Sequence, residues 1–148
     1  MTCVALDSNI LVYAELEPES AKGKRAAQVI AWAAFDGVIP VQVLGEFLRV
    51  VQRRVPSAFE EAVRQAALYR ETFLTPATTD AVMTEAAKLA LRHRLQLWDC
   101  VVCAAAIRQG AEILLTEDLQ GGGSVWNLRL LNPFSAENTS AIDAVLRR

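Results

Sequence analysis

Apolar residues along this chain form two patterns, short unbroken runs and longer stretches in which they recur every three or four positions. The short runs predict buried strands at residues 3–6, 38–40, 73–76, 112–116 and 128–131, the last as an edge strand. The longer stretches predict helices at residues 8–15, 21–35, 42–53, 57–71, 80–92, 98–108 and 140–147. Strands that alternate with helices indicate an α/β chain whose mostly parallel sheet is covered on both faces.

Polar residues at the ends of these stretches predict where several helices begin. Ser8 is expected to be the N-cap of the first helix, which would leave Asp7 free for another role. Ser57 and Glu60 have the spacing of a capping box and are expected to open the fourth helix. The helix at 98–108 is apolar nearly all round, so it should be buried.

The length and composition are those of one folded domain, spanning residues 1–148. Apolar residues make up 53% and charged residues 22% of the chain, which excludes a disordered chain or a coiled coil. The apolar runs are too short to span a bilayer, and no basic segment precedes the first of them. We therefore expect a cytoplasmic protein without a signal peptide.

The three cysteines are an odd number in apolar contexts, which argues against a disulfide framework. Cys100 and Cys103 form a C-x-x-C pair, but no second pair or neighbouring histidines complete a zinc site. Both are expected to be small core residues.

The net charge of −2 does not indicate a nucleic-acid-binding protein by itself. Twelve arginines against three lysines could nevertheless form a basic rim, because arginine suits bidentate contact with phosphate. His93 lies near a helix end, where it is expected to complement the helix dipole or to be solvated rather than catalytic. The candidates for phosphate contact are Arg53, Arg54, Arg92 and Arg94.

Four acidic residues lie at hydrophobic boundaries, where an unpaired carboxylate is costly. Asp7 and Asp118 follow the ends of two apolar runs that predict strands. Since ligands bind beyond the carboxyl ends of parallel strands, both side chains are expected at the same edge of the sheet. Glu46 and Asp99 instead interrupt apolar helical stretches.

Each of these residues also has a purely structural interpretation. The two acids that follow strands could be turn or capping residues. Glu46 could pair with Arg49 on the surface of its helix, and Asp99 could complement the dipole of the helix that it opens. Thr116 could be an ordinary strand residue or could orient a metal-bound water. Asn9 could bond to backbone or to a substrate phosphate.

Taken together, the acids predict a site for a divalent cation. Carboxylates gathered at one site raise one another's pKa values unless a cation offsets their charge. Mg²⁺ prefers oxygen ligands and also binds substrate phosphates. Two such ions about 4 Å apart can activate water for the displacement of a phosphodiester. The glycines at 121–123 are expected to form a flexible loop and lack the Lys-Ser/Thr of a phosphate-binding loop.

Five segments carry a resemblance to a known family. They are V-A-L-D-S-N, V-L-G-E-F, W-D-C, L-L-T-E-D-L-Q and L-L-N-P-F, in that order. The ordered set resembles PIN-domain ribonucleases, in particular the VapC toxins of bacterial toxin–antitoxin pairs. The resemblance implies a three-layer α/β/α sandwich with a central, mostly parallel sheet of four to five strands. It also implies a Mg²⁺- or Mn²⁺-dependent endoribonuclease that cleaves RNA by metal-activated water, is inhibited by a cognate VapB-type antitoxin, and forms a homodimer.

The resemblance also implies which residues act. The expected metal ligands are Asp7, Glu46, Asp99 and Asp118. Thr116 and Asn9 match the family's polar residues beside the last and first acids. Glu117 leaves open which carboxylate of the Glu117–Asp118 pair faces the site.

Two other classes of protein fit parts of the pattern. A receiver-like or phosphatase-like pocket would use Asp7 as a phosphorylated nucleophile, but such sites usually need a lysine late in the chain, and none follows Asp118. A non-catalytic module that binds RNA or a partner protein would keep the acids without turnover.

Overall fold

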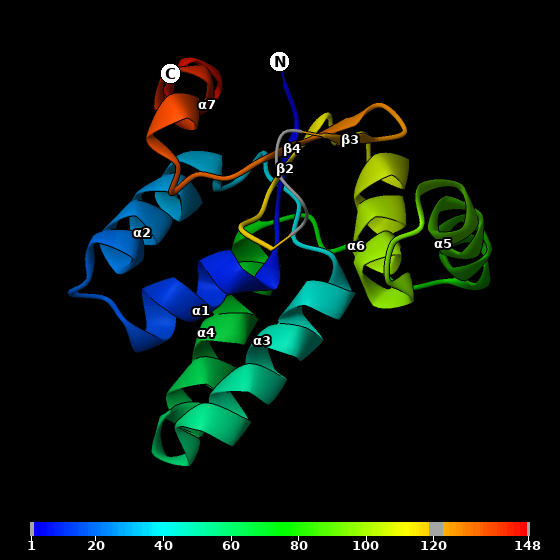
Figure 1. The fold of residues 1–148 in the computed structure, drawn as a ribbon. Coiled ribbons are helices and arrows are strands. Elements are labelled where there is room, and N and C mark those ends of the chain that lie inside the picture. Colours follow the sequence, from blue (N-terminus) through cyan, green and yellow to red (C-terminus); the bar gives the residue numbers. More distant parts are fainter. Residues whose placement is uncertain (1, 119–122, 148) are drawn as a thin grey trace.

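The sheet lies at the centre of the molecule (Figure 1), in a computed structural model that describes residues 2–118 and 123–147. In these ranges it has four strands in the order β1-β2-β4-β3. Their bounds are β1 Val4–Leu6, β2 Ile113–Leu115, β3 Ser124–Val125 and β4 Leu128–Leu131. β1, β2 and β4 are parallel to their neighbours and β3 is antiparallel to β4, so the predicted mostly parallel sheet is confirmed.

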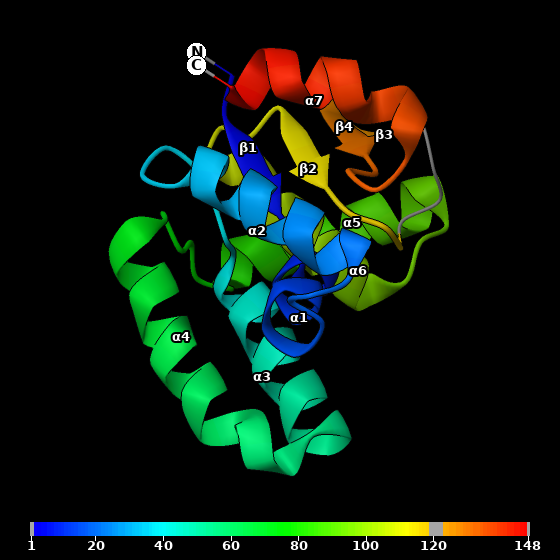
Figure 2. The ribbon, with the colours of Figure 1, turned by 90° about the vertical axis from the view of Figure 1, so that its left-hand side faces the viewer.

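The helices are α1 Ser8–Leu16, α2 Ala21–Ala33, α3 Val41–Arg54, α4 Phe59–Thr72, α5 Asp80–His93, α6 Leu97–Arg108 and α7 Thr139–Leu146. Figures 1 and 2 show α1, α2 and α7 on one side of the sheet and α5 and α6 on the other. α3 and α4 pack against each other and extend beyond the sheet. The expected α/β/α sandwich is confirmed, and each predicted helix ends within two residues of its expected position.

The predicted strands at 38–40 and 73–76 are each reduced to one paired residue. Val38 pairs with Ala5 and with Leu74 in isolated parallel bridges that continue the sheet past β1. Pro40 and Pro76 follow closely and have no N–H to donate, so neither segment extends into a strand.

The predicted strand at 128–131 is confirmed as β4, but its expected position at the edge of the sheet is wrong. β4 lies between β2 and β3, because the chain reverses at Trp126 and pairs Val125 with Leu128. Trp126 has a φ of 58°, a left-handed conformation that brings the two strands together. The expected loop at Gly121 and Gly122 lies outside the described residues.

The predicted capping box is also wrong. A short 3₁₀ turn, Pro56–Ala58, precedes α4, and the N-cap is Ala58, which makes no side-chain capping bond. Pro56 favours this tight turn because its φ is fixed in the helical range.

α6 is buried along most of its length, as its all-round apolar pattern predicts. Residues 100–106 are all buried, and Cys100 and Cys103 are free thiols in the core. Because α6 is rigidly packed against α5 and the sheet side of the core, the residue at its first turn has a fixed position. Within the described residues, no helix has both the length and the apolar character needed to cross a membrane.

Candidate active site

Asp7 stands where β1 ends and α1 begins. Its Oδ1 accepts the Ser8 N–H at 2.7 Å, and its Oδ2 accepts the Thr116 hydroxyl at 2.7 Å. The expectation that Ser8 caps α1 is wrong, because Asp7 itself is the N-cap. The extended backbone at Asp7, with φ −88° and ψ 167°, lets one residue close the strand and open the helix. Its side chain is only 6% exposed.

Thr116 follows β2 and joins the two acids that end strands. Its buried hydroxyl donates to Asp7 and accepts the Asp118 backbone N–H at 3.2 Å and Asn9 Nδ2 at 3.4 Å. Thr116 therefore orients the Asp7 carboxylate, a role that differs from both sequence-based interpretations.

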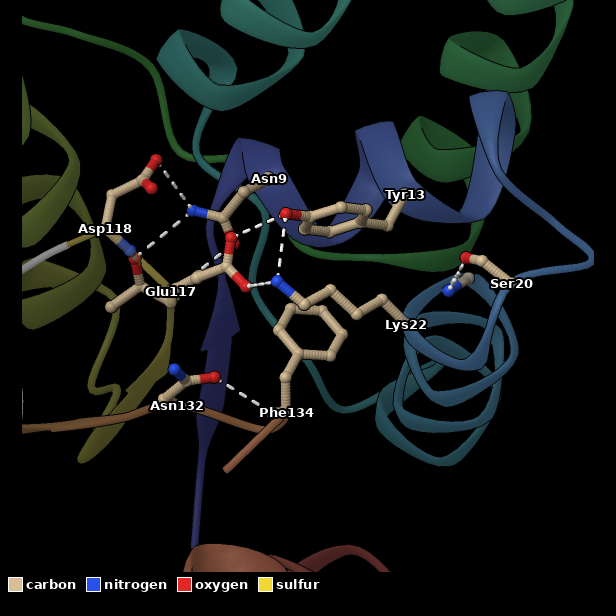
Figure 3. Close-up of polar contacts among 10 residues, drawn as sticks. Asn9, Tyr13, Ser20, Lys22, Glu117, Asp118, Asn132 and Phe134 are labelled. Atoms are coloured by element: carbon tan, nitrogen blue, oxygen red, sulfur yellow. Dashed lines mark hydrogen bonds and ion pairs between the residues drawn. The ribbon is translucent and has the colours of Figure 1, made fainter. Parts of the chain in front are cut away.

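Asn9, on the first turn of α1, connects to the same segment. Its Nδ2 donates to Asp118 Oδ2 at 3.2 Å, and its Oδ1 accepts the Glu117 N–H at 3.2 Å (Figure 3). Asn9 thus bonds to both backbone and side chain after β2 and fixes the side chain of Asp118.

Glu117 turns away from Asp118 and toward α1 and α2. It accepts hydrogen bonds from Tyr13 Oη at 2.6 Å and from Lys22 Nζ at 2.5 Å (Figure 3). Although burial raises the pKa of Glu117, the bonds from Lys22 and Tyr13 outweigh it, and the net pKa is lowered. Lys22 also lies over the rings of Tyr13 and Phe134, 5.0 and 5.6 Å from their centroids. The ambiguity between the two acids is thus resolved geometrically, with Asp118 turned to Asn9 and Glu117 bound elsewhere.

Glu46 on α3 is half-buried and bonded to two neighbours. Its Oε2 accepts the Ser8 hydroxyl at 3.0 Å, and its Oε1 accepts Gln42 Nε2 at 3.2 Å. Among the described residues, no ion pair joins Glu46 to Arg49, so that surface interpretation is not what the structure shows.

Asp99 lies in the first turn of α6, where its charge complements the helix dipole. It is not the cap, because the N-cap is Gln96, whose Oε1 accepts the Asp99 N–H at 3.0 Å. Burial raises the pKa of Asp99, and the charges of Glu46 and Asp118 raise it further.

The charges of the four acids act on one another. Burial raises the pKa of Asp7 to about 6, the bonds from Thr116 and Ser8 counteract part of the shift, and the charges of Glu46 and Asp99 add to it. Four separate segments therefore bring Asp7, Glu46, Asp99 and Asp118 within electrostatic reach of one another. The result is a pocket of excess negative charge.

The donor set suits Mg²⁺, because every candidate ligand is a carboxylate oxygen and the most buried one, on Asp7, is held at an energetic penalty. Within residues 2–118 and 123–147, however, no three His, Cys, Asp or Glu side chains already converge as in a finished metal site. Both carboxylate oxygens of Asp7 and of Glu46 are engaged in hydrogen bonds.

Sequence reasoning missed three polar residues that shape this pocket. Ser8 and Gln42 hold Glu46, and Gln96 caps the helix that carries Asp99. Gln42 could have been found from its i,i+4 spacing to Glu46. Nothing in the sequence links Ser8 to Glu46, because that contact depends on how α1 packs against α3. His93 lies in the last turn of α5, at the helix end where a dipole role was expected.

A central, mostly parallel sheet between helices, with acids near the ends of two of its strands, is an α/β/α sandwich. Residues 4–120 match the family model for the PIN domain, so this chain belongs to the PIN domain family. No curated protein sequence matches the chain significantly. Membership of this family leaves no support for the receiver-like or phosphatase-like alternative.

Solved structures of toxins have the same fold. VapC20 of Mycobacterium tuberculosis, described as a toxin that cleaves the sarcin–ricin loop, is 17% identical with a TM-score of 0.68, over 85% of this chain and 98% of that one. A chain of a toxin–antitoxin complex from Klebsiella pneumoniae is 20% identical with a TM-score of 0.67. The match covers 89% of this chain and 98% of that one. VapBC2 from Rickettsia felis, bound to a DNA fragment from its promoter, is 18% identical with a TM-score of 0.65. The match covers 88% of this chain and 98% of that one.

Proposed function

We propose that this chain is a VapC-like toxin, an endoribonuclease that depends on Mg²⁺ or Mn²⁺ and is inhibited by a VapB-type antitoxin. The observation that carries the proposal is the buried Asp7 carboxylate, whose pKa is raised to about 6 beside Glu46 and Asp99. Groups with shifted pKa values cluster at functional sites, and a bound cation would neutralise the charge that burial makes costly here. The cleavage of RNA by a toxin with the same fold supports the choice of substrate.

The chain's own residues have distinct roles in this proposal. Asp7, Glu46, Asp99 and Asp118 would hold the metal. When bound, Mg²⁺ would supply an activated water and would stabilise charge on the leaving oxygen of the phosphodiester. Thr116 keeps the Asp7 carboxylate in one orientation through its 2.7 Å bond, and so limits the rearrangement needed on binding.

The decisive experiment compares purified Asp7→Asn with the unchanged protein on labelled RNA, in Mg²⁺, in Mn²⁺ and in EDTA. Loss of the most buried carboxylate is expected to lower cleavage by more than about a hundredfold, because the amide cannot replace a charged metal ligand. EDTA should abolish cleavage by the unchanged protein. Glu19→Gln is the matched control, since Glu19 is an exposed acid, and it should cleave normally.

The outcomes separate the proposal from its alternatives. Undiminished cleavage by folded Asp7→Asn would contradict the assignment. RNA binding without turnover in either metal would instead identify a non-catalytic PIN module. Circular dichroism of each variant shows whether a loss of activity reflects the site or the fold.

The partner is proposed from the toxin–antitoxin complexes with the same fold. A small protein encoded by a neighbouring reading frame should co-purify with this chain and inhibit its cleavage of RNA. Because an inhibitor that covers the acidic pocket excludes RNA, its removal should restore full activity. A homodimer, as expected from the resemblance, can be checked by light scattering of the purified chain.

A further inference from the structure

A groove opens beside the acidic site, between α3 and the start of α6. Its volume is about 630 Å³, within the range of small-molecule sites. Gln42 and Arg49 line it from α3, and Gln96 and Trp98 line it from the α6 side. Glu46 and Asp99 border the same groove, so it is continuous with the proposed metal site.

The Trp98 side chain is unusually exposed to solvent for a tryptophan. It is 45% exposed, although tryptophan is the largest side chain available to bury. It precedes Asp99 directly, on a helix whose following residues are fully packed in the core. The Trp98 ring is therefore held near the acids by a rigid element, with an aromatic surface that solvent or a ligand can cover.

Arg49 lies in the same groove and links it to a second one. The second groove, about 330 Å³, is lined by Arg49, Val50, Arg53 and Arg54. Within the described ranges, neither a hydrogen bond nor an ion pair engages the side chains of Arg49 and Arg53, and Arg54 has only a 3.8 Å contact with Glu17. Positive charge therefore runs along α3, away from the acids.

We propose that Trp98 stacks on a base of single-stranded RNA and that Arg49 binds a phosphate of the same strand, which makes this groove the nucleotide subsite beside the metal-binding acids. The inference rests on the proposed nuclease function and adds where the substrate lies. An aromatic face beside a free guanidinium suits a nucleotide, whose base stacks and whose phosphate is anionic. The amide groups of Gln42 and Gln96 can meet base edges by hydrogen bonding.

The test measures binding rather than cleavage, in the Asp7→Asn background. The probes are a fluorescently labelled random-sequence octaribonucleotide and an abasic ribose-phosphate chain of the same length. Trp98→Ala should weaken binding of the octaribonucleotide about tenfold or more and leave the abasic probe within twofold, because only the base contact is lost. Trp98→Phe should retain most of the affinity. Trp126→Ala is the matched control, since Trp126 is also exposed, at 60%, but lies outside the groove.

Arg49→Gln tests the phosphate contact separately. It should weaken binding of both probes by about fivefold and reduce the dependence of affinity on salt concentration, because one phosphate contact is removed. Arg70→Gln, an exposed arginine on α4, is its control and should change neither.

Two results would overturn the inference. One is unchanged affinity of Trp98→Ala for the octaribonucleotide, including the case in which that variant loses a co-purifying protein partner instead. The other is an equal loss on both probes, which would mean that Trp98 supports the fold or the backbone contact rather than a base. Because binding is read without turnover, failure of RNA cleavage by the unchanged protein would refute the nuclease proposal separately.

Discussion

Replacing Asp7 by asparagine should make the metal-free protein more stable at alkaline pH, although it removes a proposed metal ligand. Burial raises the pKa of Asp7 to about 6 from the ordinary 3.8. The folded state therefore binds the proton more tightly than the unfolded chain does. The stability that comes with protonation is complete below about pH 4 and is lost as the pH rises through 6.

The shift corresponds to roughly 3 kcal/mol, and about two thirds of it falls between pH 4.5 and 8. An asparagine carries no charge, so it avoids this cost of burying a charge, but its amide NH₂ makes a poorer hydrogen bond than the carboxylate does. The Thr116 hydroxyl already accepts N–H groups from Asn9 and Asp118, so an amide NH₂ at position 7 would meet a filled acceptor, at a cost of about 1 kcal/mol at any pH. Asp7→Asn should thus be about 2 kcal/mol more stable than the unchanged protein at pH 8 and nearly equal to it at pH 4.5.

Urea unfolding in metal-free buffer, followed by circular dichroism at several pH values, measures this difference directly. Glu19→Gln, an exposed substitution, should differ from the unchanged protein by less than about 0.5 kcal/mol. If the free energies of unfolding of Asp7→Asn and the unchanged protein run parallel from pH 4.5 to 8, the buried charge is not destabilising, and the electrostatic case for a cation fails.

Three further results are expected. Adding Mg²⁺ at pH 8 to a hundredfold excess over its Kd should stabilise the unchanged protein by about 2.7 kcal/mol but not Asp7→Asn, as thermal unfolding can show; equal stabilisation would mean that the ion binds elsewhere. Asp118→Asn should lower the kcat/KM for RNA at least about a hundredfold. Glu117→Gln should lower it less than about threefold, because Glu117 is bonded to Lys22 and Tyr13. Similar losses in the two variants would contradict the assignment of Asp118. Thr116→Val should cost about 2 kcal/mol of unfolding free energy and Thr116→Ser much less, since the hydroxyl serves Asp7 and two N–H donors; urea melts with equal losses would point to packing instead.

Much of the fold follows from local pattern. Most of the longer helices were predictable because their apolar residues recur at helical spacing, and β1 and β2 because their apolar runs are short and bounded. β3 was missed because two residues, Ser124 and Val125, are too few for any alternation to be visible. β3 forms only because the chain reverses at Trp126, and an aromatic residue is not one of the residue types that predict a turn.

The candidate site could be predicted in part for the same reason. Asp7 and Asp118 follow predicted strands, so the topology of a parallel sheet brings them to one edge. The choice between Glu117 and Asp118 was not predictable, because it depends on Lys22, which α2 brings to the end of β2. The bond between Ser8 and Glu46 likewise exists only once α1 has packed against α3.

The four acids come from segments spread between residues 7 and 118 of a 148-residue chain. Domains are synthesised from the N-terminus at about 5–20 residues per second, so the last carboxylate is added several seconds after the first. During translation, a growing chain that still lacks Asp118 cannot assemble the complete set of anionic ligands. If the proposed function holds, an unfinished copy could not cleave RNA, and an inhibitor made at the same time would have that interval in which to bind.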